Sequence, residues 1–134
     1  MGIRDEKSRP ARILVADDEP AVADLLCKLL EREGHEVKIA SDGNQAIDLA
    51  RETRPDLIIM DINMPQMNGY EATSRIKETD QLKEVPVLFL SGQAAEEDGG
   101  RAFCSGGLTF IRKPFPNWQI TDLVNLTLQS LRKA

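Results

Sequence analysis

The sequence predicts a single α/β domain in which a parallel sheet is covered by helices on both faces. The chain has 134 residues, of which 41% are apolar, and this length and composition suit one hydrophobic core. Five short apolar runs rich in β-branched residues alternate with stretches of helical spacing. The run from Leu57 to Met60 is apolar at every position, as a strand covered on both faces must be. The short connections between the runs favour right-handed βαβ units.

The predicted strands are the five apolar runs, preceded by a polar segment without periodicity. The strands span residues 12–16, 36–40, 57–60, 87–90 and 108–111. Residues 1–11 carry Pro10 and are interpreted as a frayed lead-in to a domain that spans residues 12–134.

Five helices are predicted between and after these strands. Apolar residues recur at three and four positions from Ala21 to Leu30, and Gly34 ends that first helix. The others are expected around 46–50, ending before Pro55, and over 70–78, 94–104 and 120–131. The fourth contains Gly99 and Gly100, each costing about 1 kcal/mol relative to Ala in a helix interior. Two interpretations stay open: a segment that orders on activation or partner binding, or a short frayed helix without consequence.

Charge and composition exclude several classes of function. The chain has 17 Lys and Arg against 22 Asp and Glu, a net charge of −5, which argues against binding nucleic acid or an anionic membrane surface. No apolar run approaches the roughly 20 residues that cross a bilayer, and the charged N-terminus does not resemble a signal peptide. Cys27 and Cys104 form no C-x-x-C pair, so neither a disulfide scaffold nor a cysteine zinc site is expected, and the cytoplasm is the expected location.

Polar residues follow four of the five predicted strands. They are Asp17, Asp18 and Glu19 after the first strand, Asp61 and Asn63 after the third, Ser91 after the fourth and Lys113 after the fifth. Ligands of open parallel sheets bind beyond the carboxyl ends of the strands. Crowded carboxylates need a cation to stay ionised, and oxygen ligands without His or Cys select a hard ion such as Mg²⁺. A hydroxyl and an ammonium group would then hold the oxygens of a transferred phosphoryl group, with a carboxylate as its acceptor.

Each of these residues also has a simpler interpretation. Asp18 or Glu19 could cap a helix that begins at Pro20, and Ser91 could cap the fourth helix. Asp61 could be an ordinary turn residue and Lys113 an ordinary surface lysine. Their joint placement at one edge of one sheet favours a functional site.

Four motifs carry a resemblance to a known family. They are ILVADDEP at 13–20, LIIMDINMPQMNGYE at 57–71, VPVLFLSG at 85–92 and FIRKPF at 110–115. Over residues 12–132 the chain resembles the receiver domain of two-component response regulators. The spacings agree: 44 residues separate Asp17 from Asp61, 30 separate Asp61 from Ser91, and 22 separate Ser91 from Lys113. The resemblance implies a flavodoxin-like (βα)5 fold with strand order 2-1-3-4-5.

The resemblance also implies a role for each site residue. Asp61 would accept a phosphoryl group from the phosphohistidine of a sensor histidine kinase or phosphotransfer protein. Mg²⁺ would be bound by Asp18, by Asp61 and by the backbone carbonyl of Asn63, and through water by Asp17. Lys113 and Ser91 would contact phosphoryl oxygens, with the Lys113–Pro114 peptide cis. Phe110 would be the switch aromatic that responds to Ser91, although the family often has tyrosine there and a purely structural core role for Phe110 stays open.

The function implied is that of a phosphorylation-switched signalling module that turns over no external substrate. A phosphohydrolase of the haloacid dehalogenase type would need an acid two residues after Asp61, where this chain has Asn63. A receiver-like interaction module independent of phosphate would lack one of the reactive groups, and here all are present. Output would pass to a downstream protein or a linked effector domain outside this chain, which is either a stand-alone receiver or a piece of a longer regulator.

The remaining expectations concern surfaces and single residues. The resemblance implies an interaction surface, and a possible homodimer, through the fourth helix, last strand and fifth helix, including Arg101, Phe110 and Arg112. His35 is expected to be a solvent-facing turn residue. Trp118 is expected to be a core or hinge contact.

Overall fold

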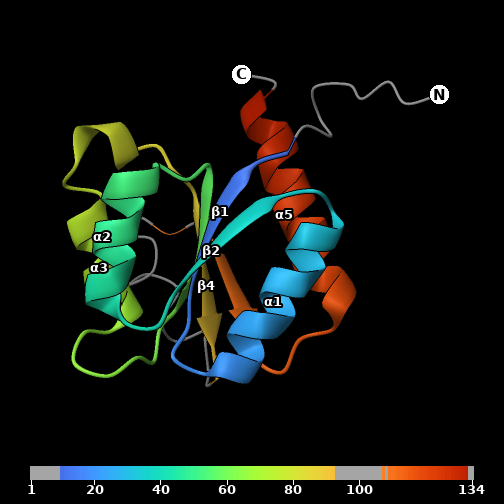
Figure 1. Cartoon of the computed structure of the whole chain (residues 1–134), viewed down its shortest axis with the longest axis horizontal. Coiled ribbons are helices and arrows are strands. Elements are labelled where there is room, and N and C mark those ends of the chain that lie inside the picture. The colour runs from blue at the N-terminus through green and yellow to red at the C-terminus, as the bar shows by residue number, and fades with distance from the viewer. Residues whose placement is uncertain (1–9, 93–106, 108, 133–134) are drawn as a thin grey trace.

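A computed structural model describes residues 10–92, 107 and 109–132, which form a parallel sheet between two helical layers (Figure 1). The strands are β1 (Arg12–Ala16), β2 (Glu36–Ala40), β3 (Leu57–Asp61), β4 (Val87–Ser91) and β5 (Thr109–Arg112). The helices are α1 (Pro20–Arg32), α2 (Gly43–Thr53), α3 (Gly69–Ile76) and α5 (Asn117–Arg132), with a 3₁₀ helix, η2, at Asp80–Leu82. The sheet order is β2-β1-β3-β4-β5, with every neighbouring pair parallel. The predicted fold class and strand order are confirmed.

Each face of the sheet has its own hydrophobic core. Helices α2 and α3 cover one face and α1 and α5 the other, on the left and right of Figure 1. Strand β3 is buried throughout because side chains alternate between the faces. Ile58 and Met60 join the core beneath α2 and α3, whereas Leu57 and Ile59 join the core beneath α1 and α5. The uninterrupted apolar run therefore serves both layers.

Local signals in the sequence fix where three helices begin or end. Pro20 occupies the first turn of α1, and Gly34 follows that helix with a φ of 93°. The Asp42 side chain accepts a hydrogen bond of 2.8 Å from the Gln45 N–H and so caps α2. Asn68 caps α3 in the same way, at 2.9 Å from the Glu71 nitrogen. These caps hold the loops that leave the carboxyl edge of the sheet.

Element boundaries differ slightly from the predicted ones. Strands β3 and β4 each extend one residue further, so Asp61 and Ser91 end their strands instead of following them. Ala11, assigned to the lead-in, is buried and joins the core beneath α1 and α5. The predicted fourth helix, with Gly99, Gly100 and Arg101, lies outside the described residues.

Two expectations about single side chains were wrong. His35 is only 8% exposed, because its Nδ1 accepts a 3.0 Å hydrogen bond from the Ala11 N–H at the start of β1. Trp118 is 65% exposed. The buried row of α5 is Ile120, Val124 and Leu128, and a residue two positions before Ile120 points to the opposite side of a helix.

No helix within the described part of the chain has the length and apolar character needed to cross a membrane.

Candidate functional site

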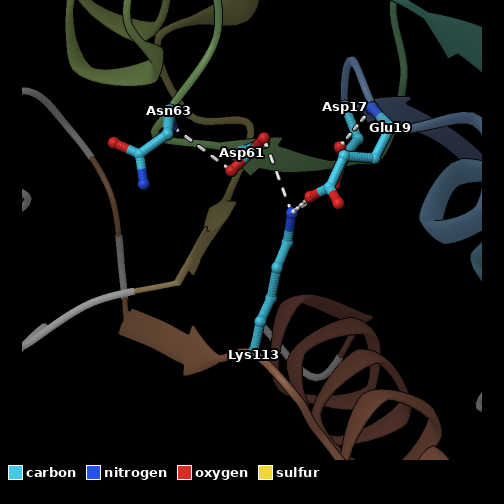
Figure 2. Close-up of polar contacts among 5 residues, drawn as sticks. All are labelled: Asp17, Glu19, Asp61, Asn63 and Lys113. Carbon is cyan, nitrogen blue, oxygen red and sulfur yellow. Dashed lines mark hydrogen bonds and ion pairs between the residues drawn. The ribbon is translucent and has the colours of Figure 1, made fainter.

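The predicted site residues come together at the carboxyl edge of the sheet, at the bottom of Figure 1. Asp17 directly follows β1, Asp61 ends β3, Ser91 ends β4 and Lys113 directly follows β5. These strands are parallel and adjacent, so their last residues must lie at the same edge. Figure 2 shows the Lys113 side chain extending toward Asp61 on one side and toward Asp17 and Glu19 on the other.

Three carboxylates converge at this edge. Oxygen atoms of Asp17, Glu19 and Asp61 all lie within 4.8 Å of one another. Asp17 and Asp61 are each 2% exposed, whereas the Glu19 side chain is 59% exposed. Asp17 Oδ1 accepts a 2.9 Å hydrogen bond from the Glu19 N–H, and Asp61 Oδ1 accepts one of 3.3 Å from the Asn63 N–H (Figure 2). The cluster thus has two buried acids and one acid at the rim.

The Lys113 ammonium group lies among these carboxylates. Its Nζ is 2.7 Å from Glu19 Oε1, 3.0 Å from Asp17 Oδ2 and 3.6 Å from Asp61 Oδ2. The Lys113 backbone N–H donates to the Ser91 carbonyl at 2.7 Å, which ties the start of this loop to the end of β4. The Lys113–Pro114 peptide is cis, as the resemblance implied.

The surroundings change the acidity of Asp61 and Lys113. The pKa of Asp61 is raised from 3.8 to about 7, chiefly by burial and in addition by the charges of Asp17 and Asp18. The Lys113 ammonium and the Asn63 N–H act in the opposite direction on that pKa. Burial lowers the pKa of Lys113, but the close contacts of its ammonium group with the Glu19 and Asp17 carboxylates outweigh burial, so that pKa lies above its ordinary value. Lys113 is therefore charged at neutral pH, and Asp61 needs added positive charge to be fully ionised.

The donor set fits a hard divalent cation. Asp17, Glu19 and Asp61 offer only oxygen atoms, which suit Mg²⁺. Asp17 Oδ2 is buried and accepts no hydrogen bond from the part of the chain that the structure describes, although it pairs with the Lys113 ammonium. A bound cation would stabilise the negative charge of a buried carboxylate oxygen that has so few partners.

The structure gathers Glu19, and not Asp18, into the cluster of converging oxygens. Asp18 is exposed, and its charge makes the smallest contribution to the raised pKa of Asp61. Its predicted role as a metal ligand, like that of the Asn63 carbonyl, stays a prediction. The sequence interpretation missed the contact between Glu19 and Lys113. A signal was present, because Pro20 places Glu19 just before a helix at the carboxyl edge, where its side chain can turn into the site.

The two predicted switch residues lie on the same side of the sheet. Ser91 is 3% exposed at the end of β4. Phe110 is half-buried against the core beneath α2 and α3, with its ring centroid 6.1 Å from that of Phe89. Phe89 in turn meets Tyr70 edge to face at 5.0 Å. Phe110 thus has a packing role, and its switching role stays a prediction.

Gly69 is a further residue on which the site depends. A Cβ atom at this position would lie 2.4 Å from the Asp61 carbonyl oxygen and 2.9 Å from Met60 Cγ. Only glycine allows the start of α3 to approach the end of β3 this closely. The Gly69 N–H also donates to the Ile62 carbonyl at 2.9 Å, which closes the loop after Asp61.

Comparison with known proteins settles the family. The family model described as "Response regulator receiver domain" matches residues 13–125. This chain belongs to the response regulator receiver family. Its site therefore occupies the position where receiver domains carry their acidic pocket.

Similar proteins include short and long regulators. The chain is 32% identical to Protein PilH of Pseudomonas aeruginosa, over 88% of this chain and 98% of that protein. It is 36% identical to the polar-differentiation response regulator DivK of Brucella anthropi, over 78% of this chain and 85% of that protein. It is 34% identical to the probable transcriptional regulatory protein TcrX of Mycobacterium tuberculosis, over 84% of this chain, and spans only 47% of that regulator's length.

Solved structures agree with the observed fold. The chemotaxis protein CheY4 of Vibrio cholerae superposes with a TM-score of 0.84 at 29% identity, over 88% of this chain and 98% of that one. A CheY-like receiver domain protein from Methanospirillum hungatei gives a TM-score of 0.86 at 25% identity, over 93% of this chain and 98% of that one.

Proposed function

We propose that this receiver accepts a phosphoryl group on Asp61 in a Mg²⁺-dependent reaction, from the phosphohistidine of a histidine kinase or phosphotransfer protein. One observation carries the proposal: a buried carboxyl group at the carboxyl edge of the sheet, between a second buried carboxylate and the Lys113 ammonium. A buried acid with a pKa of about 7 is poorly stabilised as an anion, so its site favours added positive charge such as a bound divalent cation.

The reaction transfers the phosphoryl group between two protein side chains. A carboxylate oxygen of Asp61 attacks phosphorus, the bond from phosphorus to the donor imidazole breaks, and the imidazole leaves with the electron pair. The Lys113 ammonium pairs with one phosphoryl oxygen and the Ser91 hydroxyl donates to another. Bound Mg²⁺ supplies positive charge that offsets the negative charge of the transferred group. It would be held by Asp17 and Asp61, with Asp18 and the Asn63 carbonyl as the further ligands that the family resemblance suggests.

The neighbourhood of Lys113 suits a protein donor. A groove of about 380 Å³ lies beside the lysine, with Val22, Leu25, Pro114 and Phe115 in its lining. Because Asp61 is only 2% exposed, the donor must bring its phosphohistidine against this edge of the sheet. Contact between apolar donor side chains and the groove would orient that approach.

The product is a switched state of the domain and not a released compound. Phosphorylation adds roughly −1.5 to −2 charge and three acceptor oxygens beside Ser91 and Lys113, enough to shift a balance between two packings. We propose that the chain turns over no external substrate and acts in the cytoplasm. Its output would pass to a downstream protein, to a linked effector domain, or through a homodimer that uses β5 and α5.

Intact-protein mass spectrometry after incubation with acetyl phosphate and Mg²⁺ tests the proposal. The expected result is one added phosphoryl group, absent in Asp61→Asn and absent when a chelator removes the metal. A missing adduct could also reflect rapid hydrolysis, so beryllofluoride binding to the unmodified protein is measured in parallel. Failure of both would overturn the proposal in favour of a receiver-like interaction module independent of phosphate.

A further inference from the structure

Glu19 makes the shortest contact of the Lys113 ammonium group. Its Oε1 is 2.7 Å from Lys113 Nζ, compared with 3.0 Å for Asp17 Oδ2 and 3.6 Å for Asp61 Oδ2. The contact joins residues 94 positions apart, between the start of α1 and the loop after β5. Glu19 is also the only one of the three carboxylates exposed at the rim, with 59% of its side chain accessible against 0% for Asp17 and 2% for Asp61.

The Glu19 side chain does not serve as a cap for helix α1. Glu19 occupies the N-cap position of α1, yet its side chain caps no N–H of that helix among the described residues. Its backbone N–H is held instead by Asp17 Oδ1, at 2.9 Å. The loop thus fixes the backbone of Glu19 through a buried acid of the site and leaves the side chain directed at Lys113 (Figure 2).

A divalent cation and the Lys113 ammonium compete for the same oxygen atoms. Both require Asp17 and Asp61, and two positive charges within a few ångströms repel each other strongly in a partly buried site. An ammonium group displaced from these carboxylates needs another partner, because a mostly buried charge without one is costly. Glu19 is the carboxylate that already contacts it at the rim.

We propose that Glu19 is a positioning residue: it retains the Lys113 ammonium at the rim of the site when a divalent cation occupies Asp17 and Asp61. Lys113 then stays where an incoming phosphoryl group arrives. The inference rests on the cation site of the proposed function, and it does not require phosphoryl transfer to occur.

The number of carboxylates around Lys113 predicts how the loss of Glu19 changes Mg²⁺ affinity. Before the cation binds, Lys113 has three carboxylates, so the loss of Glu19 removes one contact of several. After the cation binds, Glu19 is the principal partner, so its loss has a larger effect. Replacing Glu19 by glutamine therefore weakens Mg²⁺ binding, by about fivefold if the retained pair resembles a favourable, partly exposed ion pair.

A double-mutant cycle on Mg²⁺ affinity tests this coupling. Calorimetry measures the Mg²⁺ dissociation constant of the wild-type chain, Glu19→Gln, Lys113→Met and the double variant. We expect Glu19→Gln to weaken binding about fivefold when Lys113 is present and to leave it nearly unchanged when residue 113 is methionine. Lys113→Met itself should bind Mg²⁺ more tightly, because the competing charge is gone.

A matched control separates position from net charge. Glu31→Gln removes the same charge from the other end of α1, about 16 Å from Pro20 along the helix axis, and should leave Mg²⁺ affinity unchanged. An equal loss of affinity from Glu19→Gln in both residue-113 backgrounds would mean that Glu19 acts as a direct ligand or through its charge alone, and would overturn the proposal. No loss in the wild-type background, or no Mg²⁺ binding at all, would overturn it as well.

A second measurement does not depend on how well the Lys113 variant folds. The side-chain ¹⁵N resonance of Lys113 is followed in the wild-type chain and in Glu19→Gln during a Mg²⁺ titration. A retained pair keeps the ammonium signal sharp in the wild-type chain and broadens it in the variant at saturation. Identical signals in both would contradict the proposal, whereas absence of the acetyl phosphate adduct together with intact coupling would contradict only the proposed phosphoryl transfer.

Discussion

Two half-buried lysines, in different regions of the molecule, have opposite environments. Lys113 lies among carboxylates at the carboxyl edge of the sheet, and its pKa is raised. Lys77, just after α3, donates to the backbone carbonyls of Lys83, at 3.0 Å, and Val85. Burial lowers the pKa of Lys77, and only the charge of Glu84 opposes this. One lysine is matched to negative charges and the other to neutral dipoles.

The difference separates a reactive site from a structural contact. The carbonyl groups of Lys83 and Val85 accept hydrogen bonds from Lys77 and hold the connection between α3 and β4, but they supply no excess of carboxylate charge that could bind a cation. The three carboxylates around Lys113 exceed its single charge, and that excess is available to a cation. Removing each lysine should therefore affect different properties of the protein.

The largest effect is expected from Lys113→Met. Loss of the ammonium removes a charge that would pair with the transferred phosphoryl group, and phosphorylation by acetyl phosphate should slow on the order of a hundredfold. Stopped-flow or mass-spectrometric time courses measure this rate, with Lys77→Met as the matched control. Equal phosphorylation rates in the two variants would contradict the separate roles of the two lysines.

Asp61→Asn should stabilise the fold above neutral pH. The folded-state pKa of about 7 exceeds the unfolded value of 3.8, so the protein binds more protons when folded between these values. The stability contributed by the protonated carboxyl group is fully present below pH 3.8 and is lost as pH rises through about 7. The amide variant escapes this loss, and its free energy of unfolding at pH 8 should exceed that of the wild-type chain by on the order of 2 kcal/mol.

Urea denaturation at several pH values, without divalent cations, measures that difference. Addition of Mg²⁺ should reduce it, because a ligand that binds the folded wild-type site stabilises it by mass action. A pH-independent difference between the two proteins would show that Asp61 is not the group responsible.

Lys77→Met should weaken the fold without touching the site. The carbonyls of Lys83 and Val85 lose their donor, which should lower the free energy of unfolding by about 1.5 kcal/mol. Thermal denaturation measures the loss, and calorimetry should give an unchanged Mg²⁺ affinity. A change in that affinity would contradict the division between the two regions.

The smallest effect is expected from Thr73→Val, one turn before Lys77 in α3. The Thr73 hydroxyl is fully buried and has no hydrogen-bond partner within the described residues, so removing it should stabilise the fold by up to about 1 kcal/mol. Thr127→Val is the matched control, because its hydroxyl donates to the Leu123 carbonyl at 2.7 Å. Chemical denaturation should show stabilisation for the first variant and none for the second.

The fold class, the order of elements and most of the residues that meet at the site could be predicted from the amino-acid sequence. The pattern of apolar residues predicted the bounds of β1 and β2 correctly and those of the other strands to within one residue. This works because the burial of a strand is recorded locally, in the run of apolar side chains along it. Asp17, Asp61, Ser91 and Lys113 could be grouped in advance, since the carboxyl ends of adjacent parallel strands share one edge. The strand order came from the family resemblance, which the structure confirmed.

The contacts of side chains at turns and at the rim of the site could not be predicted in this way, because they depend on how distant segments pack. The pairing of Glu19 with Lys113 spans 94 positions and depends on how two loops approach each other. The raised pKa of Asp61 depends on burial by residues from several strands and loops. His35 is buried and Trp118 is exposed. The packing of β1 against His35 and the orientation of α5 set these surroundings, and the residue type alone does not predict them. Periodicity reports which face of an element is covered, whereas the environment of a single loop residue is set by segments far away in the chain.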